Sequence, residues 1–286
     1  STTLLLSWVA SSYLLTSAAF LLPLGRLADI IGRKKVFIWG LGLFSITSLL
    51  CALARSMPVL IAVRSLQGAA GSAVFGTSMA ILSSVFPPQE RGKVLGINIG
   101  TVYVGLSLGP SLGGIMTYHL GWESIFLFTS AISAVAFGLA VTRLKGEWSD
   151  AKSEPYDFAG AVLYIFGLTA FLYGISSIAA SILARYFLLI GIIALASFVL
   201  VELHSKHPLL NLRLFKNITF AFSNLAALIN YSATFAVGFI LSLYLQVVRG
   251  YDAQAAGMIM LIQPAIQAIL SPYAGALSDR VDSRIL

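Results

Sequence analysis

The segment LLLSWVASSYLLTSAAFLLPL, residues 4–24, has no charged side chain and is followed at once by GRLADIIGRKK, residues 25–35. A helix of about 20 apolar residues is long enough to cross the hydrocarbon core of a bilayer. Basic residues directly after such a run are typical of the cytoplasmic end of a membrane span. Together the two segments predict a membrane-crossing helix that ends in a charged loop.

Similar apolar runs continue through the rest of the chain. They lie at residues 36–54, 57–87, 94–118, 124–142, 158–184, 186–201, 218–248 and 253–278, with Arg64 as the one charge inside them. The runs lack the polar–apolar alternation of membrane β-strands. Of the 286 residues, 58% are hydrophobic and only 10% are charged, which is too little charge to cover a soluble domain. We therefore predict an all-α, polytopic transmembrane helical bundle with about nine spans.

The loops between these runs differ sharply in charge. One alternate set carries most of the 18 basic residues, and the other carries only Arg55, Arg185 and Arg249. Positive loops stay on the cytoplasmic side, so residue 1 is predicted outside and the chain in the plasma membrane. The net charge of +7 then reflects topology and contact with anionic membrane lipid rather than nucleic acid. The basic set is Arg26, Arg33, Lys34, Lys35, Arg91, Lys93, Arg143, Lys145, Lys152, Lys206, Arg213, Lys216, Arg280 and Arg284.

The loop at residues 25–35 has a spacing that charge bias alone does not explain. Gly25 and Gly32 permit a tight reversal between two helices, and Asp29 and Arg33 are four residues apart, close enough to pair if this segment is helical. The pattern GRLAD at residues 25–29 recurs as GALSD at residues 275–279, which indicates an internal repeat. The loop resembles the one between helices 2 and 3 of the major facilitator superfamily. This resemblance implies a conformational latch formed by Gly25, Asp29, Gly32, Arg33 and Lys34.

Arg64 is the one charge well inside a predicted span. An unpaired arginine at that depth costs at least a few kcal/mol, so the side chain needs a partner or water. The alternative is that it snorkels to the outer interface, about two turns away. The stretch LIAVRSLQGAAG, residues 60–71, resembles the helix-4 motif of the superfamily. The resemblance implies a role in proton coupling for Arg64 and Gln67.

A glycine ladder with proline lies in the run at residues 94–118. Gly105, Gly109 and Gly113 share one helix face, which lets two backbones approach closely, and Pro110 removes a backbone hydrogen bond and bends the helix. Ordinary helix packing would also explain such a ladder. Together with Gly114, the stretch resembles the helix-5 motif of superfamily antiporters, which favours export over uptake.

The domain organisation follows from two runs between the half-bundles, residues 158–184 and 186–201, which a 12-helix transporter would not have. PLLNLRLFKN, residues 208–217, resembles the entry to the second half of the 14-helix drug:proton antiporters. This resemblance places the chain at their helices 2 to 10. We expect residues 1–142 to form an N-terminal half-bundle lacking its first helix. Residues 143–216 then hold cytoplasmic linkers and two extra central helices, and residues 217–286 begin the C-terminal half-bundle.

Other chemistry has little support in the sequence. His204 and His207 could touch a metal, but no cluster of carboxylates or cysteines joins them, so a solvated loop is the simpler interpretation. No phosphate-binding loop or nucleophile elbow occurs. We therefore expect no enzyme activity, no metal and no cofactor, with a proton gradient as the source of energy.

The resulting prediction is a secondary active transporter that exports small hydrophobic or amphipathic molecules, of multidrug efflux type, by alternating access around a midplane site. We expect a monomer that exchanges protons and binds a small-molecule substrate. No acid lies in the middle of a span, and the resemblance puts the proton-carrying acid on a preceding helix. The alternatives are a uniporter or importer of a lipid-like or nutrient molecule, and an inactive truncated scaffold. Polar or aromatic residues at membrane depth are candidates for the substrate cavity: Trp8, Tyr13, Asn224, Asn230, Tyr231, Gln263 and Gln267.

The charge bias makes a topological prediction. A cysteine placed at Ser56 should react from outside with a thiol reagent that cannot cross the membrane, because its loop belongs to the less basic set. Cysteines at Gln89 and Ser153 should react only after the cytoplasmic face is opened. Labelling of Ser153→Cys in intact cells would show that the predicted orientation is wrong.

Overall fold

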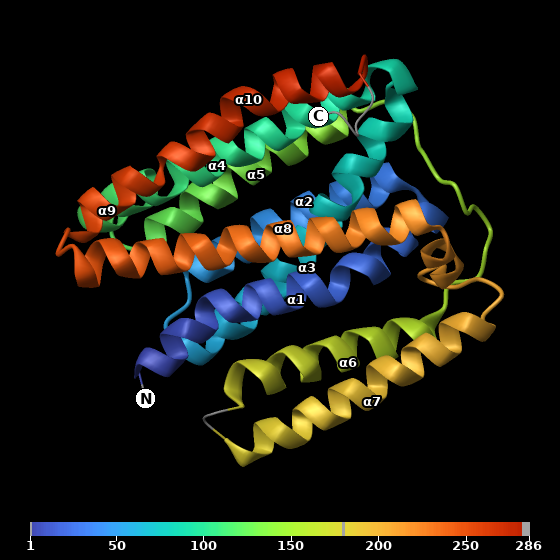
Figure 1. Cartoon of the computed structure of the whole chain (residues 1–286), viewed down its shortest axis with the longest axis horizontal. Coiled ribbons are helices and arrows are strands. Elements are labelled where there is room, and N and C mark those ends of the chain that lie inside the picture. Colours follow the sequence, from blue (N-terminus) through green and yellow to red (C-terminus); the bar gives the residue numbers. More distant parts are fainter. Residues whose placement is uncertain (1, 179–180, 282–286) are drawn as a thin grey trace. The chain divides into compact units, whose positions relative to one another are not determined.

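The computed structural model describes residues 2–178 and 181–281, and this part of the chain is helical and contains no strand (Figure 1). Nine of its stretches are long and apolar enough to cross a membrane. The predicted all-α bundle is therefore confirmed. The helices are α1 (Thr2–Ile31), α2 (Arg33–Ala52), α3 (Met57–Val85), α4 (Arg91–Leu120), α5 (Glu123–Arg143), α6 (Phe158–Ser177), α7 (Ile182–His204), α8 (Ile218–Leu243), α9 (Ala253–Met260) and α10 (Ile262–Ser278).

The expected loop at residues 25–35 is much shorter in the structure. Helix α1 continues through Gly25 and Asp29 to Ile31, and α2 begins at Arg33. The chain reverses at Gly32 alone, whose φ of 117° is a conformation that side-chain-bearing residues rarely adopt. One glycine is thus sufficient for the reversal, and the charged residues around it stay on regular helix.

Two other boundaries differ from the sequence-based ones. Helix α6 ends at Ser177, earlier than the expected residue 184, and Ser181 caps α7 by accepting the N–H of Leu183. The run at residues 253–278 is divided at Leu261 into α9 and α10. Pro264 lies in the first turn of α10, where the missing N–H costs nothing, and its ring would clash with the carbonyl of a continuous α9. Proline therefore sets this break.

The helices group into two compact units, Ser1–Ile81 with Met116–Leu212, and Leu82–Ile115 with Arg213–Leu286. The half-bundle boundaries expected at residues 142 and 216 stay a prediction. In the first unit, α6 and α7 form a closely packed antiparallel pair, and α2 packs on α5. Ser45 and Ser130 join α2 to α5 because each hydroxyl donates to the carbonyl of the other, at 3.0 and 2.9 Å.

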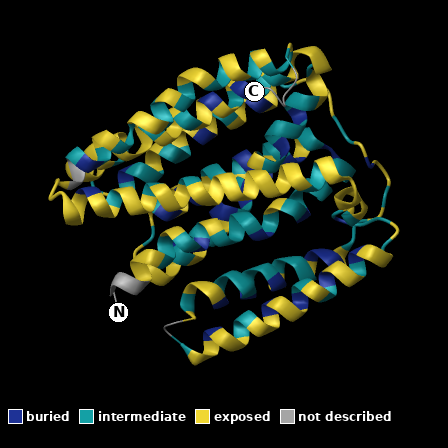
Figure 2. Ribbon diagram, in the orientation of Figure 1, coloured by how far each residue is buried: buried dark blue, intermediate teal, exposed yellow. Residues whose placement is uncertain are grey.

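Small residues bring α6 and α7 together. A β-carbon added at Gly174 would lie 2.5 Å from the backbone N of Leu188, and one added at Gly191 would overlap the backbone N of Phe171. Close backbone approach at small residues is the usual way in which membrane helices associate, since lipid provides no hydrophobic driving force. Most large apolar side chains are instead exposed, as on α8 (Figure 2), which fits a surface that faces lipid.

Gly191 offers a test of this packing. Gly191→Val should lower the melting temperature of the purified protein, because overpacking against a backbone costs about 1–3 kcal/mol. Gly238→Val is the matched control, since a β-carbon at Gly238 in α8 meets nothing within 4 Å. Thermal unfolding in detergent would measure both. Equal melting temperatures would contradict the close α6–α7 contact.

Candidate functional site

The α1–α2 junction brings together the residues predicted to form a latch. Arg33 donates from Nε to the Asp29 carboxylate at 2.9 Å, and its Nη2 lies 2.8 Å from the same oxygen. The helical pairing expected from their spacing is therefore present. The N–H of Gly32 donates to the Ala28 carbonyl at 2.9 Å and closes the last turn of α1. Ala28 is buried with Val36 of α2 and Ala73 of α3. Apolar packing therefore also stabilises the junction.

Sequence reasoning missed a segment that lies along this junction. Residues 147–154, here called the acidic strap, follow α5 and were expected to be only a linker. The backbone N–H of Arg33 donates to the Trp148 carbonyl at 2.8 Å, and the N–H of Ala151 donates to the Asp29 carbonyl at 3.0 Å. Ala151 is only 4% exposed. The strap is thus joined to the junction by backbone bonds on both sides of Gly32.

Side chains of the strap add charged contacts. The Glu147 carboxylate accepts the backbone N–H of Lys34 at 2.9 Å, which places an anion at the N-terminus of α2, where the helix dipole favours it. The Asp150 carboxylate lies 2.5 Å from Nη2 of Arg33. Arg33 therefore contacts Asp29 of α1 and Asp150 of the strap. Gly25 is further back in α1, with nothing within 4 Å of an added β-carbon.

The end of the strap is held by a three-residue group. Glu154 accepts from Nη2 of Arg26 at 2.6 Å, and Nδ1 of His207 lies 3.0 Å from the same carboxylate oxygen. The hydrogen bonds from His207 and then Arg26 hold the pKa of the Glu154 carboxyl below its usual value. Just beyond, the Tyr156 hydroxyl donates to the Pro23 carbonyl at 3.2 Å. Burial raises the pKa of this phenol, so it stays a neutral donor.

Arg64 lies inside a span and is hydrogen bonded, although no carboxylate is bonded to it among the described residues. Its Nε donates to the Val9 carbonyl at 3.1 Å, and its Nη1 donates to the Gln67 side-chain oxygen at 2.5 Å. The guanidinium carbon is 4.3 Å from the centroid of the Tyr13 ring, a cation–π contact. Arg64 is therefore turned toward α1, where its guanidinium is held by Val9, Gln67 and Tyr13.

Gln67 extends this polar group into the interior of the first unit. Its side-chain amide donates to the Ser48 hydroxyl at 2.7 Å, and that hydroxyl donates to the Phe44 carbonyl at 2.7 Å. Gln67 and Ser48 are almost completely buried. A continuous chain of hydrogen bonds thus runs from Arg64 on α3 to the backbone of α2. The amide of Gln67 fixes the guanidinium orientation because its own position is determined at both ends.

The glycine ladder of α4 has open space around it, whereas the Gln67–Ser48 network is buried. A β-carbon added at Gly105, Gly109 or Gly114 would meet no described atom within 4 Å. Helix α4 continues through Pro110, and Gly113 lies in the same helix. The role of this motif in transport stays a prediction.

The N-terminal half of α4 has a close contact with α10 that the sequence-based site did not include. Asp279, the repeat counterpart of Asp29, accepts the backbone N–H groups of Gly92 and Lys93 at 2.7 and 2.8 Å. Its carboxylate therefore caps α4 and neutralises the positive end of the helix dipole. A β-carbon at Gly96 would lie 2.5 Å from the Ser271 carbonyl, so the two backbones touch. The repeated GALSD motif was the signal that could have identified Asp279.

The candidate substrate residues are divided between the two units. Tyr13 lines a cavity of about 590 Å³ among α1, α2, α3 and α5, whose other walls are mainly apolar with a few hydroxyl groups. Trp8 is packed against Tyr173 of α6, with ring centroids 5.6 Å apart. In the second unit the remaining candidates lie on α8 and α10, and the Asn224 amide donates to the Phe220 carbonyl of its own helix. The role of all seven in substrate binding stays a prediction, and the five in the second unit are Asn224, Asn230, Tyr231, Gln263 and Gln267.

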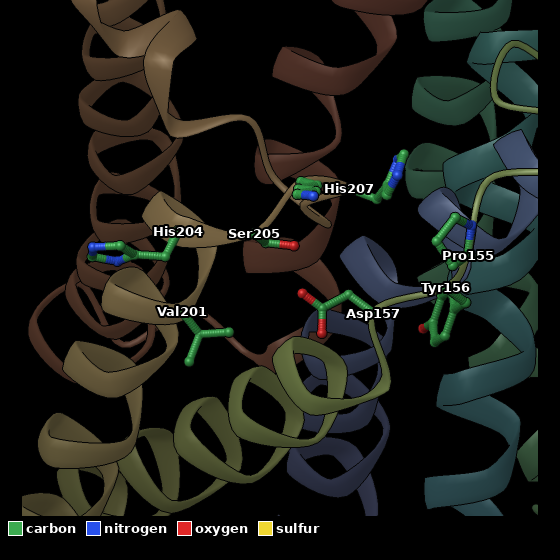
Figure 3. Close-up of a pocket in the computed structure, with 8 residues that line it drawn as sticks. Pro155, Tyr156, Asp157, Val201, His204, Ser205 and His207 are labelled. Carbon is green, nitrogen blue, oxygen red and sulfur yellow. The ribbon is translucent and has the colours of Figure 1, made fainter.

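A second cavity, of about 450 Å³, lies between residues 155–157 and the end of α7 (Figure 3). Its two histidines point in opposite directions, His207 toward the strap and His204 away from it. Nδ1 of His204 is 2.8 Å from the Leu200 carbonyl of its own helix. No group of three or more possible metal ligands occurs within residues 2–178 and 181–281. The two rings therefore do not converge on a common ligand.

Nine stretches long and apolar enough to cross a membrane, within the described residues, are the mark of a polytopic α-helical membrane protein. The chain belongs to the Major Facilitator Superfamily, whose family model matches residues 1–286. The predicted membership is confirmed. The chain is accordingly a multi-pass protein of the cell membrane and not an enzyme, and transporters of this superfamily generally need no cofactor.

Curated relatives match nearly the whole chain. It is 32% identical to the riboflavin transporter RibZ of Clostridioides difficile over 278 residues, which cover 96% of this chain and 60% of RibZ. It is 30% identical to the multidrug resistance protein Stp of Mycobacterium tuberculosis over 285 residues, 98% of this chain and 53% of Stp. The methylenomycin A resistance protein of Streptomyces coelicolor is 32% identical over 286 residues, 98% of this chain and 58% of that protein. The chain thus spans between half and three fifths of the length of these relatives.

The Asp279 cap can be tested by stability. Asp279→Ala leaves two N–H groups in the first turn of α4 without their acceptor, so we expect a loss of about 1–2 kcal/mol and a lower melting temperature. Glu90→Ala is the matched control, because it removes an exposed acid immediately before α4. Thermal unfolding of both variants would measure the difference. An unchanged melting temperature for Asp279→Ala would contradict the cap.

Proposed function

We propose that this chain is part of a proton-coupled exporter of small hydrophobic or amphipathic molecules, which works by alternating access. The observation that carries the proposal is the Arg64 site. A guanidinium is held at membrane depth by Val9, Gln67 and Tyr13, and none of these groups neutralises its charge. A fixed cation in such a place favours the ionised form of any carboxylate that approaches it.

This electrostatic effect gives Arg64 a role in coupling. A carboxylate that moves toward Arg64 releases its proton more readily, and one that moves away takes a proton up again. A conformational change that alters this separation therefore couples proton movement to transport. The buried Gln67–Ser48 hydrogen bonds keep the guanidinium in place during the cycle. The acid that carries the proton is unassigned.

Alternating access also needs elements that hold one conformation. We propose that the Asp29–Arg33 pair and the Asp279 cap act as latches in their respective units, because both place a carboxylate at a helix end. The glycine ladder at Gly105, Gly109, Pro110, Gly113 and Gly114 is the proposed contact along which α4 moves in an antiporter. Its open face on α4 leaves room for a close helix partner.

The substrate class is supported by the relatives. Stp and the methylenomycin A resistance protein are named for resistance to drugs, and efflux of a drug from the cell is a direct route to resistance. We propose small molecules with large apolar surfaces as substrates, protons as the coupling ion, and a monomer surrounded by membrane lipid. Tyr13, with its ring over Arg64, is the proposed link between the substrate and proton sites.

A second function has support from one relative. RibZ is named as a riboflavin transporter and is 32% identical to this chain, so transport of a planar nutrient molecule is the alternative. The two functions differ in direction and substrate. Vesicles loaded either with a cationic dye or with riboflavin would show which solute moves, and whether an imposed pH gradient drives it.

Arg64 provides the test of proton coupling. Arg64→Ala should reduce dye transport into inverted vesicles under an imposed pH gradient to background, because the cation that promotes proton release is lost. Arg64→Lys should keep roughly a tenth to a half of the activity, since lysine retains charge without the planar fork of donors. Protein amounts are matched between the variants.

Arg55→Ala is the control for this experiment, because it removes an exposed arginine just before α3. It should transport at the wild-type rate. Full activity of Arg64→Ala would exclude the proposed coupling role. Activity that needs no pH gradient in any variant would exclude proton coupling altogether.

A further inference from the structure

The acidic strap forms hydrogen bonds with three of the five predicted latch residues. Its backbone bonds join Trp148 to Arg33 and Ala151 to Asp29, and its Glu147 carboxylate accepts the N–H of Lys34. These partners are more than 110 residues away in the sequence. The α1–α2 junction therefore cannot change its geometry at Gly32 without moving or releasing the strap.

The charged contacts of the strap are suited to release. Arg33 and Arg26 are only 11% and 17% exposed, whereas their partners Asp150 and Glu154 are 73% and 39% exposed. Solvent and salt can reach the acidic side of each pair, and such pairs are individually weak. Ala151, at 4% exposed, must come into solvent when the strap leaves. The strap thus has several weak contacts and one residue whose exposure reports its position.

His207 adds a last contact at the end of the strap. Its Nδ1 lies 3.0 Å from the same Glu154 oxygen that accepts from Arg26. The hydrogen bonds from His207 and Arg26 hold the pKa of the Glu154 carboxyl below its usual value and so favour its ionised form. The end of the strap is therefore held both from α1 and from the segment that follows α7.

We propose that the acidic strap is a releasable lock on the α1–α2 junction. The purpose of the lock rests on the proposed transport function and on the predicted cytoplasmic location of the strap. While the strap is docked, the junction keeps one geometry, so a transport step that moves the junction waits for release of the strap.

The position of the strap can be measured without any substrate. Ala151→Cys is made in a background where Cys51, which is buried, is replaced by serine. The reaction rate with an impermeant maleimide is followed in inside-out membrane vesicles and divided by the rate at Lys152→Cys, an exposed neighbour. Because Ala151 is covered when the strap is docked, we expect a ratio of about one tenth or lower.

The acids are then neutralised without changing their shape. The double variant Asp150→Asn with Glu154→Gln should raise the rate ratio about fivefold, because two charge-assisted contacts are lost. Lys145→Gln, made alone, is the control, since it removes an exposed charge from the same linker. It should leave the ratio unchanged. An unchanged ratio in the double variant would overturn the lock. Dye transport is measured in parallel, so loss of the proposed function and loss of the lock give different results.

Discussion

In lipid, each backbone N–H and C=O must find a hydrogen-bond partner within the protein, because the hydrocarbon offers none. This constraint makes every long apolar segment of the chain helical, and it confines each break to a place where the freed groups are satisfied. Gly32 lies outside the hydrocarbon, on the side predicted to be cytoplasmic, and even there the protein itself satisfies the freed groups. Its own N–H closes the last turn of α1, and the next N–H, of Arg33, is taken by the Trp148 carbonyl of the strap. The reversal is therefore short because a distant segment supplies the missing acceptor.

The same constraint explains where polar side chains occur at membrane depth. Thr47 and Thr77 donate to carbonyls of their own helices, at 2.7 and 2.6 Å, and so carry no free donor. Gln67 differs because its amide bonds Ser48 on another helix. It holds two helices together and also orients Arg64. A buried polar network of this kind is costly unless each member is satisfied. Its presence inside a span therefore indicates function more strongly than a single hydroxyl does.

Much of the fold could be predicted from the sequence because its signal is local. Run length gave the spans, and the four-residue spacing gave the Asp29–Arg33 pair. The breaks at Gly32 and Leu261 depend on a single glycine or proline, so their positions were harder to place within a charged or apolar run. Arg64 was predicted to be functional from its position inside a span and from the resemblance of residues 60–71 to the superfamily's helix-4 motif. Its bonding to Gln67 follows from their spacing on one helix, whereas the bond from Gln67 to Ser48 depends on how α2 and α3 rotate against one another.

The strap was missed for a different reason. Residues 143–157 mix both signs of charge, and such a composition is typical of a solvated linker. Trp148 and Ala151 contact the junction through backbone atoms, which any residue could provide. These contacts therefore cannot be predicted from the residue types in the sequence. The side chains of Glu147, Asp150 and Glu154 each require a donor or a basic partner, and several residues could have provided one. Backbone hydrogen bonds between segments far apart in the chain cannot be predicted from the spacing of residue types.

The two copies of the repeated motif use the same carboxylate in different ways. Asp279 accepts two backbone N–H groups at the start of α4. Asp29 instead pairs with Arg33, whose second carboxylate, Asp150, is largely open to solvent. The Asp279 contact closes the end of one helix, whereas the Arg33 contacts join α1 to the strap, so salt that screens Asp150 also loosens the strap. The same motif position thus supplies a helix cap in one unit and a contact between separate segments of the chain in the other.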